Sequence, residues 1–190
     1  MNRPRGPEQV GESTGEDRPQ QTLEPAETHA CCRSGHLLFW GIVVAGAATD
    51  LISKPLVFSW LKSQLTHKLV LIPGLLNFTM DTNTGGPFSI FSGNAPWLAA
   101  LTVVAFAVII YLYLSFAKSG QMLLVAALGL VGAGALGNFV DRVTLGHVRD
   151  FIQVWIGSWP YPTFNAADMM LCTGAGLIAL SLLRGPRCAA

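Results

Sequence analysis

The sequence predicts an all-α membrane protein with four transmembrane helices and a small β-rich element on the outer face between helices one and two. Hydrophobic residues make up 51% of the 190 residues, and charged residues only 12%. That charged fraction is about half of the ~25% found in soluble domains. Mean hydropathy is +0.46. The composition excludes an ordinary soluble enzyme and also a nucleic-acid-binding protein, which needs a basic face.

Four apolar stretches are the second observation behind this prediction. They cover residues 37–53, 97–117, 121–140 and 164–183, each close to the ~20 residues that cross the hydrocarbon core of a bilayer. The third stretch holds several small residues, such as Gly132 and Gly137, which allow helices to approach closely in lipid. We expect residues 37–190 to form one four-helix transmembrane domain.

The N-terminal segment, residues 1–36, differs from the rest of the chain. It is rich in Pro, Glu, Gln, Gly and Thr, and no Glu occurs after Glu27. Without an apolar period, this polar tail is expected to be disordered. An acidic start with no apolar central region fits no cleavable secretory signal.

Two connections between the spans carry further predictions. Residues 54–96 contain KLVLIPGLLNFTM, in which two β-prone runs flank Pro73-Gly74 and predict a hairpin. Residues 141–163 are predicted to be a connecting loop whose aromatic side chains lie at the lipid–water boundary.

The basic residues favour cytoplasmic termini. Four spans place both termini on one side, and seven of the twelve basic residues fall there, against five on the opposite side. Because cytoplasmic loops carry the excess of Lys and Arg, we expect the opposite ends of the helices to face outward.

Acidic residues are sparse after the tail and gather at one end of the spans. Asp50 lies near the exit of the first span, Asp141 just past the exit of the third, Asp150 in the next loop and Asp168 about one turn into the fourth. Alternating span direction brings these four to the same, outer, membrane face. Ionisable groups in spans are costly, so each is a candidate for function. Asp81, in DTNTGG, is interpreted as a turn residue without chemistry.

Local spacing indicates which acids have partners. Asp50 and Lys54 are four residues apart and can pair, and Asp141 can pair with Arg142. Asp150 and Asp168 then remain without a basic partner. Two such carboxylates in a poorly hydrated site tend to share one proton, which suits activation of water for attack on a carbonyl.

Two amides and the helical spacing around them support a shared site. Asn138 precedes Asp141 by three residues, and Asn165 precedes Asp168 by three, so each amide lies on the helical face of an acid. We expect both amides to orient the aspartates by hydrogen bonds.

Structural readings compete with each functional one. The Asp50–Lys54 and Asp141–Arg142 pairs are more simply explained as holding helix ends than as catalysts. Asp168 alone could be a hydrogen-bonding residue between helices, and Asp150 alone could be a solvated turn acid or a cap.

No cofactor or metal is expected. The four cysteines and four histidines lack the spacing of a metal site, and Cys172 lies in an apolar run.

Five motifs in this order resemble those of bacterial lipoprotein signal peptidase, also called signal peptidase II, an aspartyl membrane protease family. They are DLISK (50–54), NTGGPF (83–88), GNFVDR (137–142), GHVRDF (146–151) and FNAAD (164–168). The resemblance covers about residues 37–183. In the second motif Gly86-Pro87 stands where the family often has two alanines, and proline removes an N–H donor there.

The resemblance implies a function and a set of site residues. The family removes the signal peptide from prolipoproteins by cleaving before a diacylglyceryl-modified cysteine, at the outer face of the cytoplasmic membrane. It uses no metal, and the cyclic peptide globomycin inhibits it. Its catalytic aspartates correspond to Asp150 and Asp168. Its other polar site residues, which bind substrate or support the site, correspond to Asp50, Lys54, Asn83, Asn138, Asp141, Arg142 and Asn165.

These implications set the expected partners and the alternatives. We expect a monomer that contacts membrane lipids, prolipoproteins with a diacylglyceryl-cysteine and globomycin-type inhibitors, but no nucleic acid. One alternative is a proton-coupled transporter, which would carry polar residues at mid-bilayer in several helices. The other is an inactive relative that binds lipopeptide without cutting it.

Overall fold

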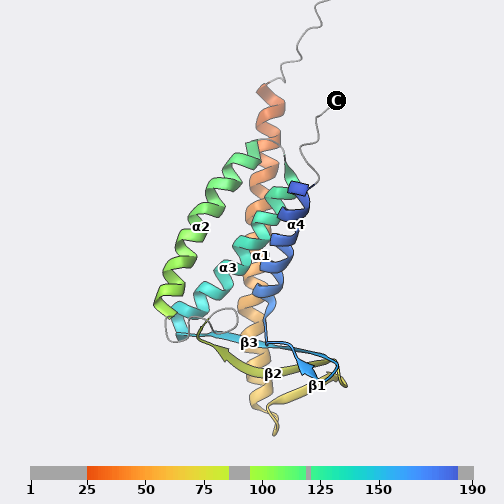
Figure 1. Cartoon of the computed structure of the whole chain (residues 1–190). Coiled ribbons are helices and arrows are strands. Elements are labelled where there is room, and N and C mark those ends of the chain that lie inside the picture. Colours follow the sequence, from red (N-terminus) through yellow and green to blue (C-terminus); the bar gives the residue numbers. More distant parts are fainter. Residues whose placement is uncertain (1–24, 86–94, 119–120, 184–190) are drawn as a thin grey trace, which may run out of the picture.

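The computed structural model describes residues 25–85, 95–118 and 121–183, and it confirms the predicted fold class. Four helices run alongside one another, and a small antiparallel sheet lies across one end of them (Figure 1). The helices are α1 (Pro25–Lys62), α2 (Ala95–Lys118), α3 (Met122–Leu145) and α4 (Ala166–Leu183). The strands are β1 (Lys68–Ile72), β2 (Leu76–Asn83), β3 (Val148–Ile156) and β4 (Trp159–Pro160), in the spatial order β1-β2-β3-β4.

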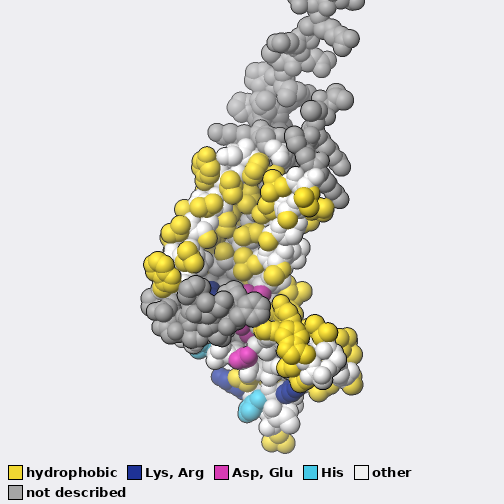
Figure 2. All heavy atoms as spheres, viewed as in Figure 1, with side chains coloured by type: hydrophobic (Ala, Val, Ile, Leu, Met, Phe, Trp, Pro, Cys, Tyr) yellow, Lys and Arg dark blue, Asp and Glu magenta, His cyan; other side chains and the backbone are white. Residues whose placement is uncertain are grey.

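All four helices have the length and composition of membrane spans. The shortest, α4, has 18 residues, or about 27 Å at 1.5 Å per residue, close to the ~30 Å hydrocarbon thickness. Hydrophobic side chains cover the visible face of the helical body, while charged side chains appear near the sheet (Figure 2). This distribution is the one expected of helices that span a bilayer and of a sheet at its boundary with water.

Helix α1 is longer than predicted at both ends. It begins at Pro25, inside the segment 1–36 that we expected to be disordered, while residues 1–24 lie outside the described part. It also continues past the predicted end near Ser53, through Pro55, to Lys62. Proline removes one helical hydrogen bond, but Phe58 and Leu61 beyond it are buried at 8% and 0% exposure. Packing of this continuing apolar face outweighs the local break.

Helix α3 is the centre of the bundle and contacts each of the other three helices. Its small residues permit this, as predicted from their composition. A Cβ atom at Gly134 would overlap the backbone carbonyl of Ala167 on α4, and one at Gly137 would overlap the carboxylate of Asp50 on α1. The glycine at position 137 therefore makes room for a polar group rather than for a helix backbone.

The predicted hairpin is confirmed. Strands β1 and β2 pair antiparallel, with Lys68 opposite Thr79 and Ile72 opposite Leu76. Gly74 in the turn has φ +73°, a left-handed conformation that glycine adopts without steric cost. The Gly86-Pro87 departure of the second motif lies outside the described residues.

The prediction of a loop at 141–163 is wrong. Helix α3 continues to Leu145 and ends at Gly146 in a left-handed cap, and β3 then pairs antiparallel with β2. The register places Asp150 opposite Asp81 and Val148 opposite Asn83. Pairing between segments so distant in the chain leaves no local sequence signal, and the aromatic residues by themselves indicate only a position at the membrane boundary.

The apolar core occupies the part of the bundle away from the sheet. It joins α1, α2 and α3 through Phe39, Val43, Ile109, Tyr113, Ala117, Val125 and Leu128. The rings of Phe39 and Tyr113 stack with centroids 3.9 Å apart. With the apolar residues gathered here, the sheet end of the bundle is left for polar groups.

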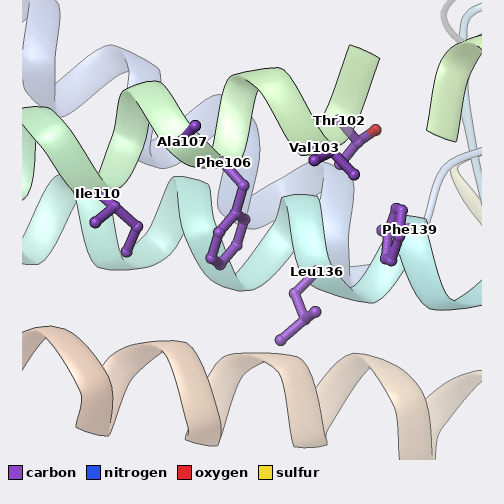
Figure 3. A pocket seen from close by; sticks show the side chains of 7 residues that line it. All are labelled: Thr102, Val103, Phe106, Ala107, Ile110, Leu136 and Phe139. Carbon is purple, nitrogen blue, oxygen red and sulfur yellow. The ribbon is translucent and has the colours of Figure 1, made fainter. Parts of the chain in front are cut away.

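A second apolar feature lies between α2 and α3. It is a cavity of about 470 Å³ lined by Thr102, Val103, Phe106, Ala107, Ile110, Leu136 and Phe139 (Figure 3). The hydroxyl of Thr102 donates to the carbonyl of Leu98 at 2.8 Å. Because that hydroxyl is satisfied within its own helix, the cavity presents an apolar lining throughout.

Candidate active site

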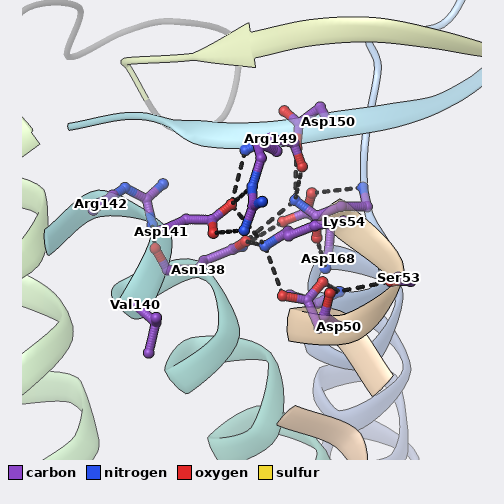
Figure 4. A network of polar contacts seen from close by, with 12 residues as sticks. Asp50, Ser53, Lys54, Asn138, Val140, Asp141, Arg142, Arg149, Asp150 and Asp168 are labelled. Carbon is purple, nitrogen blue, oxygen red and sulfur yellow. Dashed lines mark hydrogen bonds and ion pairs between the residues drawn. The ribbon is translucent and has the colours of Figure 1, made fainter. Parts of the chain in front are cut away.

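Polar residues from α1, α3, β3 and α4 meet in one network beneath the sheet (Figure 4). Asp50, Lys54, Asp141 and Asn165 are fully buried, and Asp150 and Asn138 are 2% and 5% exposed. The four acids that the sequence places at one face of the membrane do lie together. Burial of so many charged groups requires that each has a partner.

Asp150 and Asp168 face each other across asparagine side chains. The carboxylate of Asp150, on β3, accepts a 2.6 Å hydrogen bond from Nδ2 of Asn165. The carboxylate of Asp168 accepts one of 2.8 Å from Nδ2 of Asn138. Within the described part of the chain neither carboxylate has a Lys or Arg nitrogen within 4.0 Å. The predicted isolation of these two acids from basic partners is confirmed.

The start of α4 fixes the position of Asp168. Oδ1 of Asn165 accepts a hydrogen bond of 3.0 Å from the backbone N–H of Asp168. In return the backbone N–H of Asn165 donates to Asp168 at 3.2 Å. This reciprocal cap follows from the spacing N-x-x-D and satisfies two N–H groups of the first turn.

Asp150 has an unusual acidity for an aspartate. Burial, followed by the nearby charge of Asp168, raises the pKa of Asp150 from 3.8 to about 7. Hydrogen bonds from Asn165 and Asn83 and the charge of Lys54 oppose that rise but do not cancel it. Near neutral pH Asp150 therefore holds its proton for a large part of the time.

Lys54 is the centre of the supporting network. Its ammonium group lies 2.6 Å from Asp50 and 3.4 Å from Asp141, and it donates to Oδ1 of Asn138 at 3.0 Å. The predicted Asp50–Lys54 pair is confirmed. Asp50 also accepts a 2.9 Å hydrogen bond from the backbone N–H of Ala167, so the pair joins α1 to α3 and to the start of α4.

The predicted Asp141–Arg142 pair is wrong. Asp141 instead accepts hydrogen bonds from the side chain of Arg149 at 2.6 and 3.2 Å and from the Arg149 backbone at 3.0 Å. Adjacent residues of a helix point about 100° apart and do not face one another, whereas Arg149 arrives from β3. The position of Arg149 next to Asp150 in the fourth motif is the sequence signal for this pairing.

Arg142 borders the same cleft as the two aspartates. It donates to the backbone carbonyl of Asn138 at 3.4 Å and lines a cleft of about 450 Å³ together with Asn83, Asn138, Asp150 and Asp168. Further polar lining of the cleft comes from β2 and from the segment that leads into α4, and Leu171 adds an apolar wall from α4. The structure thus brings all nine sequence-predicted site residues into the cleft or the network below it.

Asp81 also belongs to this cleft, although the sequence suggested only a turn. It lies on β2 opposite Asp150 and lines the cleft. The hydroxyl of Thr163 donates to one of its oxygens, and the backbone N–H of Thr82 donates to the other at 2.8 Å. The alternation of β2 could have placed Asp81 on the face of Asn83, two residues later.

Metal ligands are not grouped in this site. Within residues 25–85, 95–118 and 121–183, no set of three or more His, Cys, Asp and Glu side chains is arranged to hold a metal ion. Cys172, at the cleft, is a free thiol.

Neutralising Lys54 alone is expected to destabilise the protein. Lys54→Met leaves the buried carboxylates of Asp50 and Asp141 without their shared cation, a loss of roughly 3–5 kcal/mol. The double variant Asp50→Asn/Lys54→Met should recover part of this, because Asp141 keeps Arg149. Membrane abundance and thermal unfolding in detergent measure the effect, and Lys62→Met at the exposed end of α1 is the matched control. Normal abundance with reduced turnover would instead place the pair in the catalytic step.

The chain is similar to known proteins over most of its length. The family model for signal peptidase (SPase) II matches residues 42–184. Lipoprotein signal peptidase of Pseudomonas paraeruginosa is 38% identical over 159 residues, which cover 82% of this chain and 93% of that protein. The same values hold for lipoprotein signal peptidase of Pseudomonas aeruginosa. A solved bacterial membrane enzyme superposes with a TM-score of 0.69 at 31% identity, covering 78% of this chain and 94% of its own.

Proposed function

The chain belongs to the signal peptidase II family, and from this premise we propose that it is an aspartic-type endopeptidase with Asp150 and Asp168 as its catalytic pair. Lipoprotein signal peptidase activity and a multi-pass location in a bacterial membrane follow from the family and the four spans. The family relationship favours the peptidase over the two alternatives, a proton-coupled transporter and an inactive lipopeptide-binding relative. The observation that carries the proposal is a pair of carboxylates, held by amides rather than by cations, in one cleft.

The two aspartates divide the acid and base roles. Asp168, fixed by hydrogen bonds from Asn138 and from the backbone of Asn165, takes a proton from the attacking water. Asp150, protonated because of its raised pKa, donates to the oxygen of the scissile carbonyl. The tetrahedral intermediate then collapses when Asp168 passes its proton to the leaving nitrogen and Asp150 recovers one from the hydroxyl. Each aspartate ends in its starting protonation state.

The remaining site residues orient this pair and hold the substrate. Asn138 and Asn165 fix the two carboxylates by one hydrogen bond each. Asp50, Lys54 and Asp141 form the buried scaffold below them. Asn83 and Arg142 line the cleft and are available to bind the peptide backbone of the substrate.

The pH dependence of cleavage follows from the roles of the aspartates. Asp150 must carry a proton to act as the acid, and its pKa is about 7. The rate kcat/KM should therefore fall as the pH rises through about 7, approaching a tenfold loss for each further unit. Initial rates between pH 5 and 9 on one lipidated peptide test this. A rate that rises across that range would give Asp150 the role of base.

The substrate is proposed to be a prolipoprotein with a diacylglyceryl-cysteine. Asp168 lies in the first turn of α4, at the level where a lipid-anchored peptide meets the bilayer. The apolar cavity between α2 and α3 begins about 10 Å along α2 from its sheet end and continues to about 22 Å. Its apolar lining and its depth suit one acyl chain of the substrate.

The proposal also covers the orientation of the enzyme in the membrane, its oligomeric state and its inhibitors. We place the active site at the outer face of the cytoplasmic membrane and the termini in the cytoplasm, because the basic residues favour that orientation. The enzyme is proposed to act as a monomer, since its site is built within one chain, and to be inhibited by globomycin-type peptides.

A direct test uses the purified enzyme. Incubation with a lipidated prolipoprotein and mass analysis of the products should give a signal peptide and a mature protein that begins at the modified cysteine. An intact precursor after complete substrate binding would support the inactive relative instead.

A further inference from the structure

Two residues outside the five motifs bridge the halves of the active site. Asp81 is on β2, and Thr163 is in the segment that leads into α4; the hydroxyl of Thr163 donates a hydrogen bond to the carboxylate of Asp81. Both side chains line the cleft. Strand β3, with Asp150, runs between the two segments, because it pairs with β2 on one side and with Phe164 on the other.

From this geometry we propose that Asp81 and Thr163 form a clasp that positions the catalytic aspartates. Asp81 is directly opposite Asp150 in an antiparallel pair, so both side chains stand on the same face of the sheet. The clasp thus crosses β3 on the face from which Asp150 enters the cleft. This inference rests on the proposed roles of Asp150 and Asp168.

The segment held by the clasp carries the groups that orient both acids. Phe164 exchanges backbone hydrogen bonds with Ile152 at 2.9 and 3.0 Å. The next residue, Asn165, donates to Asp150 at 2.6 Å and caps the turn that holds Asp168. A shift of Thr163 therefore moves the amide that fixes Asp150 and the helix start that fixes Asp168, and it changes their separation.

Asp81 is well placed for this role because its own orientation is fixed. One oxygen accepts from the backbone of Thr82 and the other from Thr163, and within the described residues it forms no ion pair. Its hydrogen bonds therefore serve the contact with the segment before α4. We class both residues as positioning residues, since they act through Asn165 and the sheet.

The test separates the hydrogen bond from the charge. Thr163→Val removes the donor but keeps the carboxylate, whereas Asp81→Asn removes the charge. Each should lower kcat by roughly tenfold with little change in KM, because misplacement of the reacting groups slows the chemical step. The double variant should be no slower than the worse single variant, since both changes break one contact. Thr163→Ser should restore most of the activity.

A pH profile and two controls complete the test. Thr163→Val should leave the pH dependence where it is in the parent enzyme, while Asp81→Asn should move it to lower pH, because a negative charge near Asp150 is lost. Thr144→Val, at an exposed hydroxyl bonded to its own helix, is the matched control. Full activity of Thr163→Val, or strictly additive losses, would overturn the clasp. Activity of Asp150→Asn in the same assay would instead overturn the catalytic pair.

Discussion

Asparagine in place of Asp150 or Asp168 is expected to abolish cleavage of a lipidated precursor, with a loss of at least about 10³-fold in kcat. An amide fills the same space and keeps the hydrogen bonds to Asn165 or Asn138 after a flip, but it cannot shuttle a proton. Product formation by mass analysis or gel shift measures the loss, down to the detection limit of the assay.

Folding must be shown to survive these changes. Asp150→Asn removes a buried group that is expensive to ionise, so its thermal unfolding temperature should stay the same or rise. Asp17→Asn, outside the family match at 42–184, is the matched control and should cleave normally. Activity within tenfold of the parent enzyme for either catalytic variant would remove that residue from the pair.

The lipid on the substrate is expected to have an effect of similar size. An unlipidated precursor should be cleaved at a small fraction of the rate of its diacylglyceryl form, even at high concentration. Each buried methylene contributes about 0.8 kcal/mol, so two acyl chains hold the substrate at the level of Asp168. Initial rates for the two forms of one precursor in detergent or vesicles measure the difference.

Variants of the apolar cavity show whether the lipid binds there. Ala107→Trp fills the space between α2 and α3 and should raise KM for a long-chain substrate more than for a short-chain one. Ala99→Trp, on the same helix but outside the cavity lining, is the control. Equal rates for lipidated and unlipidated precursor would instead indicate a general membrane protease.

The sequence predicted what depends on local pattern. Apolar length located the four helices, and Pro73-Gly74 located the β1–β2 hairpin. The spacing of Asp50 and Lys54 on one helical face predicted their pair. In each case the residues concerned are close in the chain, so their arrangement can be predicted from the sequence alone.

What the sequence did not predict depends on contacts between distant segments. The continuation of α1 past Pro55 relies on the burial of Phe58 and Leu61. The partner of Asp141 is Arg149 rather than its neighbour, because β3 carries the guanidinium back to α3. Asp81 joined the cleft through strand pairing that no local motif marks.

The Asp50–Lys54 pair on α1 has a consequence for how this helix enters the membrane during synthesis. Synthesis from the N-terminus delivers α1 to the membrane before Asn138, Asp141 and Arg149 exist. At that stage Lys54 can find only Asp50, one turn away on the same helix and 2.6 Å distant in the finished protein. A single charge in a span is costly to insert, whereas this helix brings its own counter-ion. The first span is thus able to enter the bilayer on its own. Its lysine later contacts Asn138 and Asp141 on α3 when the remaining helices assemble against it.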